Sequence, residues 1–204
     1  MAEQIFPTKG NLIKVKRSLK QATLGYELMD RKRSILVREM VALTDEAREL
    51  RSSIDSTFSE AYTALRSANI TLGVVALLAD AVPLENSLSL SSRSVMGVEL
   101  PKVTADITPP AEPSYPMIET NSDFDRAFIC FNKVKELTVR LAELENSVYR
   151  LAVAIKKTQK RRNALKNIMI PRFEQQVRFI SNALEEKERE EFSRQKVIKK
   201  RKVK

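Results

Sequence analysis

The sequence of 204 residues contains no histidine, no tryptophan, one cysteine and only four glycines. Without histidine, the chain has no histidine general base, no Ser-His-Asp triad and no histidine-ligated zinc site. Its single cysteine, Cys130, excludes an internal disulfide and a thiolate cluster, and we expect it to be a small core residue. Four glycines are about a third of average usage, which leaves few for phosphate-binding loops. We therefore expect a protein that is no enzyme, with no catalytic residue, metal ion or cofactor of its own.

Long hydrophobic runs are also lacking. The longest mostly apolar stretch, residues 70–82, is interrupted by Thr71, Gly73 and Asp80 and is too short to span a bilayer. The amino-terminal residues show no apolar core of a secretory signal peptide. We expect the chain to reach a membrane only as part of a larger complex.

Proline is scarce except in one part of the chain. Six of the eight prolines lie between Pro83 and Pro116, and long proline-free stretches flank them. This distribution predicts a coiled-coil helix over residues 1–70, an irregular insert over residues 71–122, and a second coiled-coil helix with a basic tail over residues 123–204.

The first helical segment carries a heptad repeat. Steps of three and four residues from Leu12 to Ala61 meet an apolar residue at thirteen of fifteen positions, with Arg33 and Thr57 as the exceptions. Such a repeat predicts one strand of a coiled coil. The seam predicted for this helix includes Leu12, Val15, Leu19, Ala22, Leu36, Met40, Leu43, Leu50 and Ile54.

The second helical segment has a similar seam. It begins near Asn121-Ser122-Asp123, a good helix N-cap, and its seam is apolar except at Thr158 and Arg162. Two successive steps of four residues then form a stutter, which contains Pro171 and predicts a bend or a looser turn. The predicted seam here includes Leu137, Leu141, Leu144, Val148, Leu151, Ile155, Leu165, Met169, Phe173, Val177 and Ile180.

Neither apolar stripe is stable alone in water. Two arms of similar length joined by one insert predict a long antiparallel two-helix coiled coil, and hence an all-α dominated fold. Self-association into a helical bundle is the alternative. Within the insert, small polar and apolar residues alternate around Met96-Gly97, which predicts a short β-hairpin with Gly97 at or near the turn. Its tip offers Val95, Met96, Gly97 and Val98 as candidate partner contacts, and a proline-rich connector follows over residues 107–119.

Charge is distributed unevenly. The net charge is +10, with +2 on residues 1–65, −4 on residues 66–123 and +12 on residues 124–204. One basic cluster has no acidic residue between Glu145 and Glu174; it is either a solvated helix face or a surface for an acidic protein or phosphate. The residues of this cluster are Lys156, Lys157, Lys160, Arg161, Arg162 and Lys166.

The basic tail, residues 194–204, matches a nuclear-localisation pattern that arises readily in any basic terminus. It lacks the interleaved aromatic residues of a single-stranded nucleic-acid site, so we expect no nucleic-acid partner.

Both ends of the sequence resemble one family. Residues 7–40 are similar to the amino-terminal signature of the D subunit of V-type and archaeal-type rotary ATPases, and residues 161–201 to its carboxy-terminal signature. The insert sequence SVMGVELP also resembles this family. Ser34 and Ser193 depart from the usual residues, an Asp and an aromatic. The matching residues are Pro7-Thr8-Lys9, Leu12, Leu19-Lys20, Ala22, Gly25, Leu28, Lys32-Arg33, Asn163-Ala164-Leu165, Ile170-Pro171-Arg172 and residues 185–192.

The resemblance implies a non-catalytic central-stalk subunit of a proton- or sodium-transporting V/A-type ATPase or ATP synthase. It would transmit torque between the catalytic hexamer and the membrane rotor, coupling ATP synthesis or hydrolysis to ion transport. The implied partners are the catalytic and regulatory subunits of the hexamer, the small F subunit of the central stalk and the membrane-rotor cap subunit. The implied location is cytoplasmic and peripheral to the membrane. The alternatives are a freestanding basic coiled-coil adaptor for anionic membranes or nucleic acid, and a homodimeric structural bundle.

Overall fold

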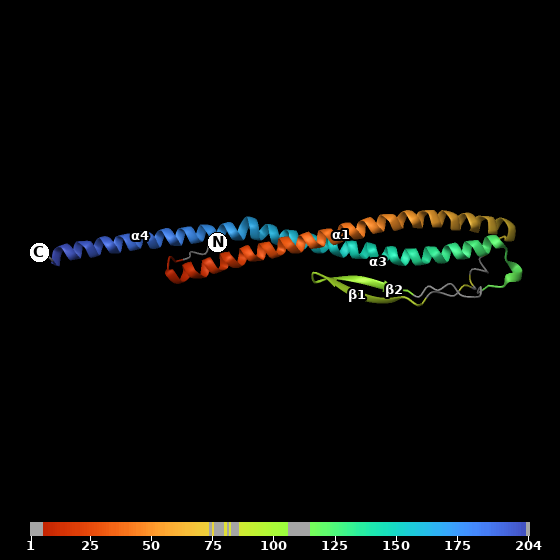
Figure 1. Ribbon diagram of the computed structural model, residues 1–204, viewed down its shortest axis with the longest axis horizontal. Coiled ribbons are helices and arrows are strands. Elements are labelled where there is room, and N and C mark those ends of the chain that lie inside the picture. Colours follow the sequence, from red (N-terminus) through yellow and green to blue (C-terminus); the bar gives the residue numbers. More distant parts are fainter. Residues whose placement is uncertain are drawn as a thin grey trace. The chain divides into compact units, whose positions relative to one another are not determined.

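Long helices dominate the computed structural model of the protein (Figure 1), which describes residues 6–73, 75, 80, 82, 86–105 and 115–202. The predicted fold class is confirmed, because long helices make up most of the described residues and the insert contains a small two-stranded antiparallel sheet. Most of the predicted proline-rich connector lies outside the described residues. The elements in chain order are α1 (Lys9–Leu72), β1 (Ser89–Val95), β2 (Val98–Thr104), a 3-10 turn (Met117–Glu119), α3 (Ser122–Ala164), a π-helix (Leu165–Met169) and α4 (Ile170–Lys202).

Local chemistry sets the ends of the helices. Thr8 caps α1, because its hydroxyl oxygen accepts a hydrogen bond of 3.2 Å from the Asn11 N–H. α1 ends at Gly73, whose φ of +80° is the left-handed conformation that favours glycine after a helix. Asn121 caps α3 as predicted, since its side-chain oxygen accepts a 3.0 Å hydrogen bond from the Phe124 N–H. Asp123 and Asp125 then lie in the first turn, where the helix dipole favours negative charge.

The chain forms two compact units, and α1 contributes to both. The terminal unit comprises Met1–Ser34 and Lys156–Lys204, and the middle unit comprises Ile35–Ile155. The units group residues by contacts in space, whereas the three predicted segments follow the order of the chain.

In the middle unit, α1 and α3 pair antiparallel. Arg126 donates a 2.6 Å hydrogen bond to Glu60, and Arg140 donates one of 2.6 Å to Glu46. The two glutamates lie 14 residues apart, as do the two arginines, and 14 residues are two heptads. The core of this pair contains Leu36, Leu43, Leu100, Leu144 and Leu151.

The β-hairpin contributes to this core. β1 and β2 pair in register from Ser89↔Thr104 to Val95↔Val98, which leaves a two-residue turn at Met96-Gly97. Both turn residues have positive φ, 51° and 73°, as a type I′ turn requires. The predicted hairpin is therefore confirmed, with Gly97 in the turn. Leu100 in β2 is fully buried against the helices, so the hairpin is part of the packed unit.

In the terminal unit, the start of α1 pairs antiparallel with the end of α3 and with α4 (Figure 1). Lys9 forms a 3.0 Å ion pair with Glu188, and Asp30 forms one of 2.6 Å with Arg162. Val15, Ala22, Thr158 and Ile180 are buried along this pair. Residues 185–201 of α4 are all exposed, including Glu188 of the first ion pair.

The stutter coincides with the π-helix. The Ile170 N–H donates to the Leu165 carbonyl, the i→i+5 bond of a wider turn. Pro171 is the second residue of α4 and follows the π-helix without a break, so it removes one backbone donor at this wider turn. This is the looser turn that the sequence predicted. Met169, the last residue of the π-turn, is 36% exposed, and its place in the seam stays a prediction.

Candidate functional site

The candidate sites on this chain are surfaces and polar contacts. Among the described residues, no group of three or more Cys, Asp or Glu side chains is placed to hold a metal ion. Over the same part of the chain, none of the helices has the length and apolar character needed to cross a membrane.

The predicted seam residues other than Met169 are buried or half-buried in their respective units. Cys130 is also buried, as a core residue would be. The seam pairs two helices in each unit, which positions the exposed side chains described next.

The basic cluster lies on one part of the terminal unit. Lys156, Lys157, Lys160 and Arg161 are exposed near the end of α3, and Lys166 is exposed in the π-helix. No acidic residue is adjacent to them in the sequence. Like charges this close on about three helical turns repel one another, so an acidic surface or phosphate brought near them would be attracted.

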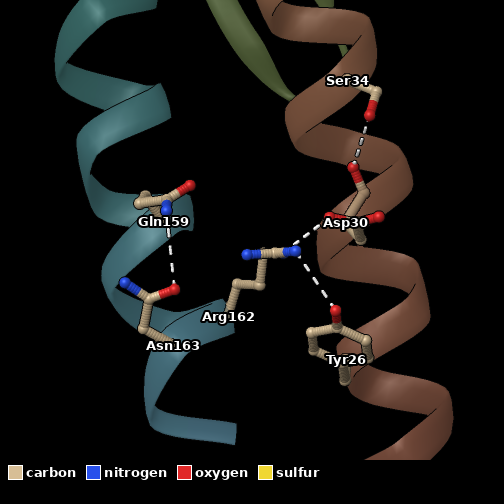
Figure 2. Close-up of polar contacts among 6 residues, drawn as sticks. All are labelled: Tyr26, Asp30, Ser34, Gln159, Arg162 and Asn163. Atoms are coloured by element: carbon tan, nitrogen blue, oxygen red, sulfur yellow. Dashed lines mark hydrogen bonds and ion pairs between the residues drawn. The ribbon is translucent and has the colours of Figure 1, made fainter. Parts of the chain in front are cut away.

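Arg162, which the sequence grouped with this cluster, has a different environment (Figure 2). Its Nε donates a 2.6 Å hydrogen bond to the Asp30 carboxylate, and its Nη2 donates a 3.2 Å bond to the Tyr26 hydroxyl oxygen. The guanidinium carbon also lies 5.2 Å from the centroid of the Tyr26 ring. Arg162 therefore points toward α1 and is only half-exposed. Its charge is already paired with Asp30 within the unit, so it has less to offer a partner than its exposed neighbours.

These contacts form a polar layer, defined here as Tyr26, Asp30, Arg33, Thr158 and Arg162. Three of its members, Arg33, Thr158 and Arg162, are among the four residues that interrupt the apolar seams, and the fourth, Thr57, lies in the middle unit. Thr158 is buried, and the half-buried Arg33 has a buried Nε with no hydrogen-bond partner among the described residues. A polar contact inside an apolar seam fixes the axial register of two helices, since a shifted register would separate the charges.

The hairpin tip is only partly available to partners. Val95 and Val98 pack against the middle-unit core, whereas Met96 is 45% exposed at the turn. Arg93 anchors β1 through a 2.7 Å ion pair with Glu39 of α1. Of the predicted tip contacts, Met96 and Gly97 are therefore the ones that the hairpin presents.

Two α3 side chains cover the outer edge of β2. The Val103 N–H donates a 2.9 Å hydrogen bond to the Glu143 carboxylate, and Arg150 donates one of 3.1 Å to the Glu99 carbonyl. Together with Leu100 and Arg93, these contacts hold the hairpin in a fixed orientation within the middle unit.

An aromatic cluster lies where the insert meets α3. Tyr115 packs edge-on against Phe124 and Phe128, with ring centroids 4.8 and 5.3 Å apart. Its hydroxyl donates a 2.8 Å hydrogen bond to Asp125. Burial and this hydrogen bond raise the pKa of Tyr115 to about 12. Beside the cluster is a cavity of about 360 Å³ lined by Leu65, Val75, Val82, Phe124, Ala127, Phe128, Phe131, Asn132 and Lys135.

The sequence did not identify the residues that hold the hairpin or those that bind Arg162. Val98 and Leu100 alternate with polar residues after the predicted turn, but this alternation does not show which helix residues contact β2. Tyr26 and Asp30 gave no separate signal, because a tyrosine at a seam position is ordinary and the acid is one among many.

A family model described as the D subunit of ATP synthase matches residues 11–200 of this chain. The chain belongs to this family of ATP synthase D subunits. It is 42% identical over 197 residues to the V-type ATP synthase D subunit of Thermotoga neapolitana, covering 96% of this chain and 97% of the relative. It is 38% identical over 200 residues to the A-type ATP synthase D subunit of Pyrococcus furiosus, covering 96% and 94%.

Membership of this family confirms the interpretation drawn from the two ends of the sequence. The D subunit is a central-stalk component of V/A-type ATP synthases and is not catalytic, so the chain is part of such a complex. A freestanding adaptor for membranes or nucleic acid is not favoured, because the similarity extends over nearly the whole chain.

Proposed function

We propose that this chain is the axle of the rotor, with its terminal unit turning inside the hexamer of catalytic and regulatory subunits. The insert end would face the membrane and bind the small F subunit of the central stalk and the cap of the membrane rotor. The supporting observation is the antiparallel helix pairing in each unit, fixed by ion pairs two heptads apart in one unit and by the polar layer in the other. Paired helices resist twisting, which an axle requires.

The exposed basic cluster supplies the asymmetry that such an axle needs. Lys156, Lys157, Lys160 and Arg161 are exposed on α3, in the arm that carries +12 over residues 124–204, whereas residues 1–65 carry only +2. Because the two arms are unequal in charge, each rotary position would favour a different state of the surrounding subunits. Coupling of this kind rests on differential contacts in each state.

Charge reversal of the cluster tests this function. Replacing Lys156, Lys157, Lys160 and Arg161 by Glu in the assembled complex should lower coupled ion transport at least tenfold relative to ATP hydrolysis. Arg162 stays native, because its loss would disturb the polar layer. The matched control carries Arg at the three lysines and Lys at position 161, which keeps every charge. Equal loss in the control, or normal coupling after reversal, would contradict the proposal.

The hairpin tip is proposed as a contact for a stalk partner or as a modulator of turnover. Deleting residues 89–103 would be a poor test, because it removes Leu100 from the middle-unit core. Met96→Lys changes the exposed tip and leaves the core intact. We expect weaker retention of the stalk partner or a changed ATP hydrolysis rate in the assembled complex, whereas Met96→Leu should have no effect.

A further inference from the structure

The two edges of the β-hairpin differ in whether their outward backbone groups already have hydrogen-bond partners. In β2, the outward backbone groups are those of Glu99, Pro101 and Val103. Arg150 binds the Glu99 carbonyl, Glu143 binds the Val103 N–H, and Pro101 has no N–H to satisfy. This edge is therefore closed to a further strand, since two of its backbone groups are already bound and a third donor is missing.

The edge of β1 is open. The register pairs Leu90 with Val103, Ser92 with Pro101 and Ser94 with Glu99. In an antiparallel ladder, both members of such a pair direct their N–H and C=O groups away from the partner strand. Leu90, Ser92 and Ser94 thus point three donors and three acceptors outward, and no hydrogen bond from another described residue reaches them.

The composition of β1 does not prevent another strand from pairing with this edge. Natural proteins place a lysine, a proline or a β-bulge in an edge strand to prevent such pairing, and none of these occurs in Ser89–Val95. The one charge in the strand, on Arg93, is directed to Glu39. Leu90 is 79% exposed. Leu100 and the α3 contacts hold the sheet in place, so the open edge is presented on a rigid support.

We propose that β1 accepts an extended strand from a protein that rotates together with this chain, extending the hairpin to a three-stranded sheet. Main-chain hydrogen bonds along a strand edge supply the affinity in this mode of recognition. The proposal rests on the axle function, because a stator strand bound here would block rotation. The partner strand carries an apolar side chain beside Leu90 and a basic one near Glu99, the exposed acid across from Ser94.

Residue-resolved amide hydrogen exchange over residues 89–95 tests this proposal. The isolated chain is compared with the assembled complex purified from cells. The amides of Ser91, Arg93 and Val95 bind β2 and should exchange slowly in both samples, which provides an internal control. Those of Leu90, Ser92 and Ser94 should exchange fast in the isolated chain and at least tenfold more slowly in the complex.

Other occupants of the edge give different results. Slow exchange of Leu90, Ser92 and Ser94 in the isolated chain would overturn the proposal. If dilution of the isolated chain abolished this slow exchange, a second copy of the chain would be the occupant. If the slow exchange persisted on dilution, a segment of the same chain would be the occupant. Fast exchange in an assembled, normally rotating complex would also overturn the proposal while leaving the axle function intact.

Two substitutions sharpen the test. Ser92→Pro removes an outward N–H without removing a ladder hydrogen bond, and Ser92→Ala is its matched control. In the complex, Ser92→Pro should abolish the protection of Leu90 and Ser94, whereas Ser92→Ala should retain it. Leu90→Lys keeps the backbone unchanged and places a charge at the edge, so it should also reduce the protection of Ser92 and Ser94. If the remaining outward amides of β1 stayed fully protected from exchange in the complex in both the Ser92→Pro and the Leu90→Lys variants, strand pairing at this edge would be excluded.

Discussion

The two units of this chain differ in sign of charge and in what holds them together. The terminal unit carries 25 basic and 9 acidic residues, a net charge of +16. The middle unit carries 11 basic and 17 acidic residues, a net charge of −6. The chain total of +10 conceals this contrast. The excess positive charge of the terminal unit destabilises it by self-repulsion and makes it attractive to acidic surfaces.

The interiors differ as well. The middle unit has a leucine core to which α1, α3 and the hairpin all contribute. The terminal unit has a seam interrupted by the polar layer, in which Arg162 and Asp30 meet. One unit therefore depends mainly on buried apolar area, and the other also on a specific polar contact. Substitutions that remove each feature separately test this difference.

The largest effect is expected in the middle-unit core. Leu100→Ala leaves a cavity at a fully buried position and should lower the free energy of unfolding by about 2–5 kcal/mol. Leu90→Ala, in the other strand at a site 79% exposed, is the matched control and should change it by less than about 0.5 kcal/mol. Urea unfolding followed by circular dichroism measures both. A small effect of Leu100→Ala would show that the hairpin is dispensable to the core.

A smaller effect is expected in the polar layer. Arg162→Leu removes the bonds to Asp30 and Tyr26 and leaves the Asp30 carboxylate without its partner, which should cost about 1–2 kcal/mol in urea unfolding. Arg161→Leu, one residue away and exposed, should cost less than about 0.5 kcal/mol.

The double variant Arg162→Leu with Asp30→Leu separates the two explanations for that cost. If the unpaired carboxylate is the cause, the double variant should recover part of the loss in urea unfolding. No recovery would show that the packing of the Arg162 stem and its contact with Tyr26 dominate.

The smallest effect at neutral pH concerns Tyr115 in the middle unit. Its pKa is raised from 10.0 to about 12, so the neutral phenol is favoured in the folded state. The associated stability is fully present below pH 10 and is lost as the pH rises through about 12. Absorbance titration at alkaline pH should show a phenol that ionises near pH 12, and Tyr115→Phe should remove that step. A titration curve in which Tyr115→Phe removes no such late step would show that the Tyr115–Asp125 contact does not persist in solution.

Much of the fold follows from local patterns. The heptad steps predicted both helices, the Asn121 cap predicted the start of α3, and Met96-Gly97 predicted the hairpin turn. These features depend on residues within a few positions of one another, so a single sequence displays them. Pro171 was predicted to loosen the helix, but the sequence did not show that the looser turn would be a π-turn over Leu165–Met169.

The candidate surfaces were less predictable. Arg162 has the same charge and nearly the same place in the sequence as Arg161, yet one binds Asp30 and the other is exposed. The difference comes from helical phase combined with the identity of a residue 132 positions away. Val95 and Val98 likewise pack against the core, because they lie on the sheet face that carries the buried Leu100.

By itself the sequence determined the helices, the seam, the turn, the uneven charge and the absence of histidine chemistry, because all of these are properties of composition or short-range periodicity. The tertiary structure alone decided which charges are matched internally and which remain exposed. It also decided which hairpin edge is closed. These outcomes depend on side chains from distant parts of the chain meeting in space, where a carboxylate within hydrogen-bonding distance of a guanidinium or a backbone N–H changes what that group can offer a partner.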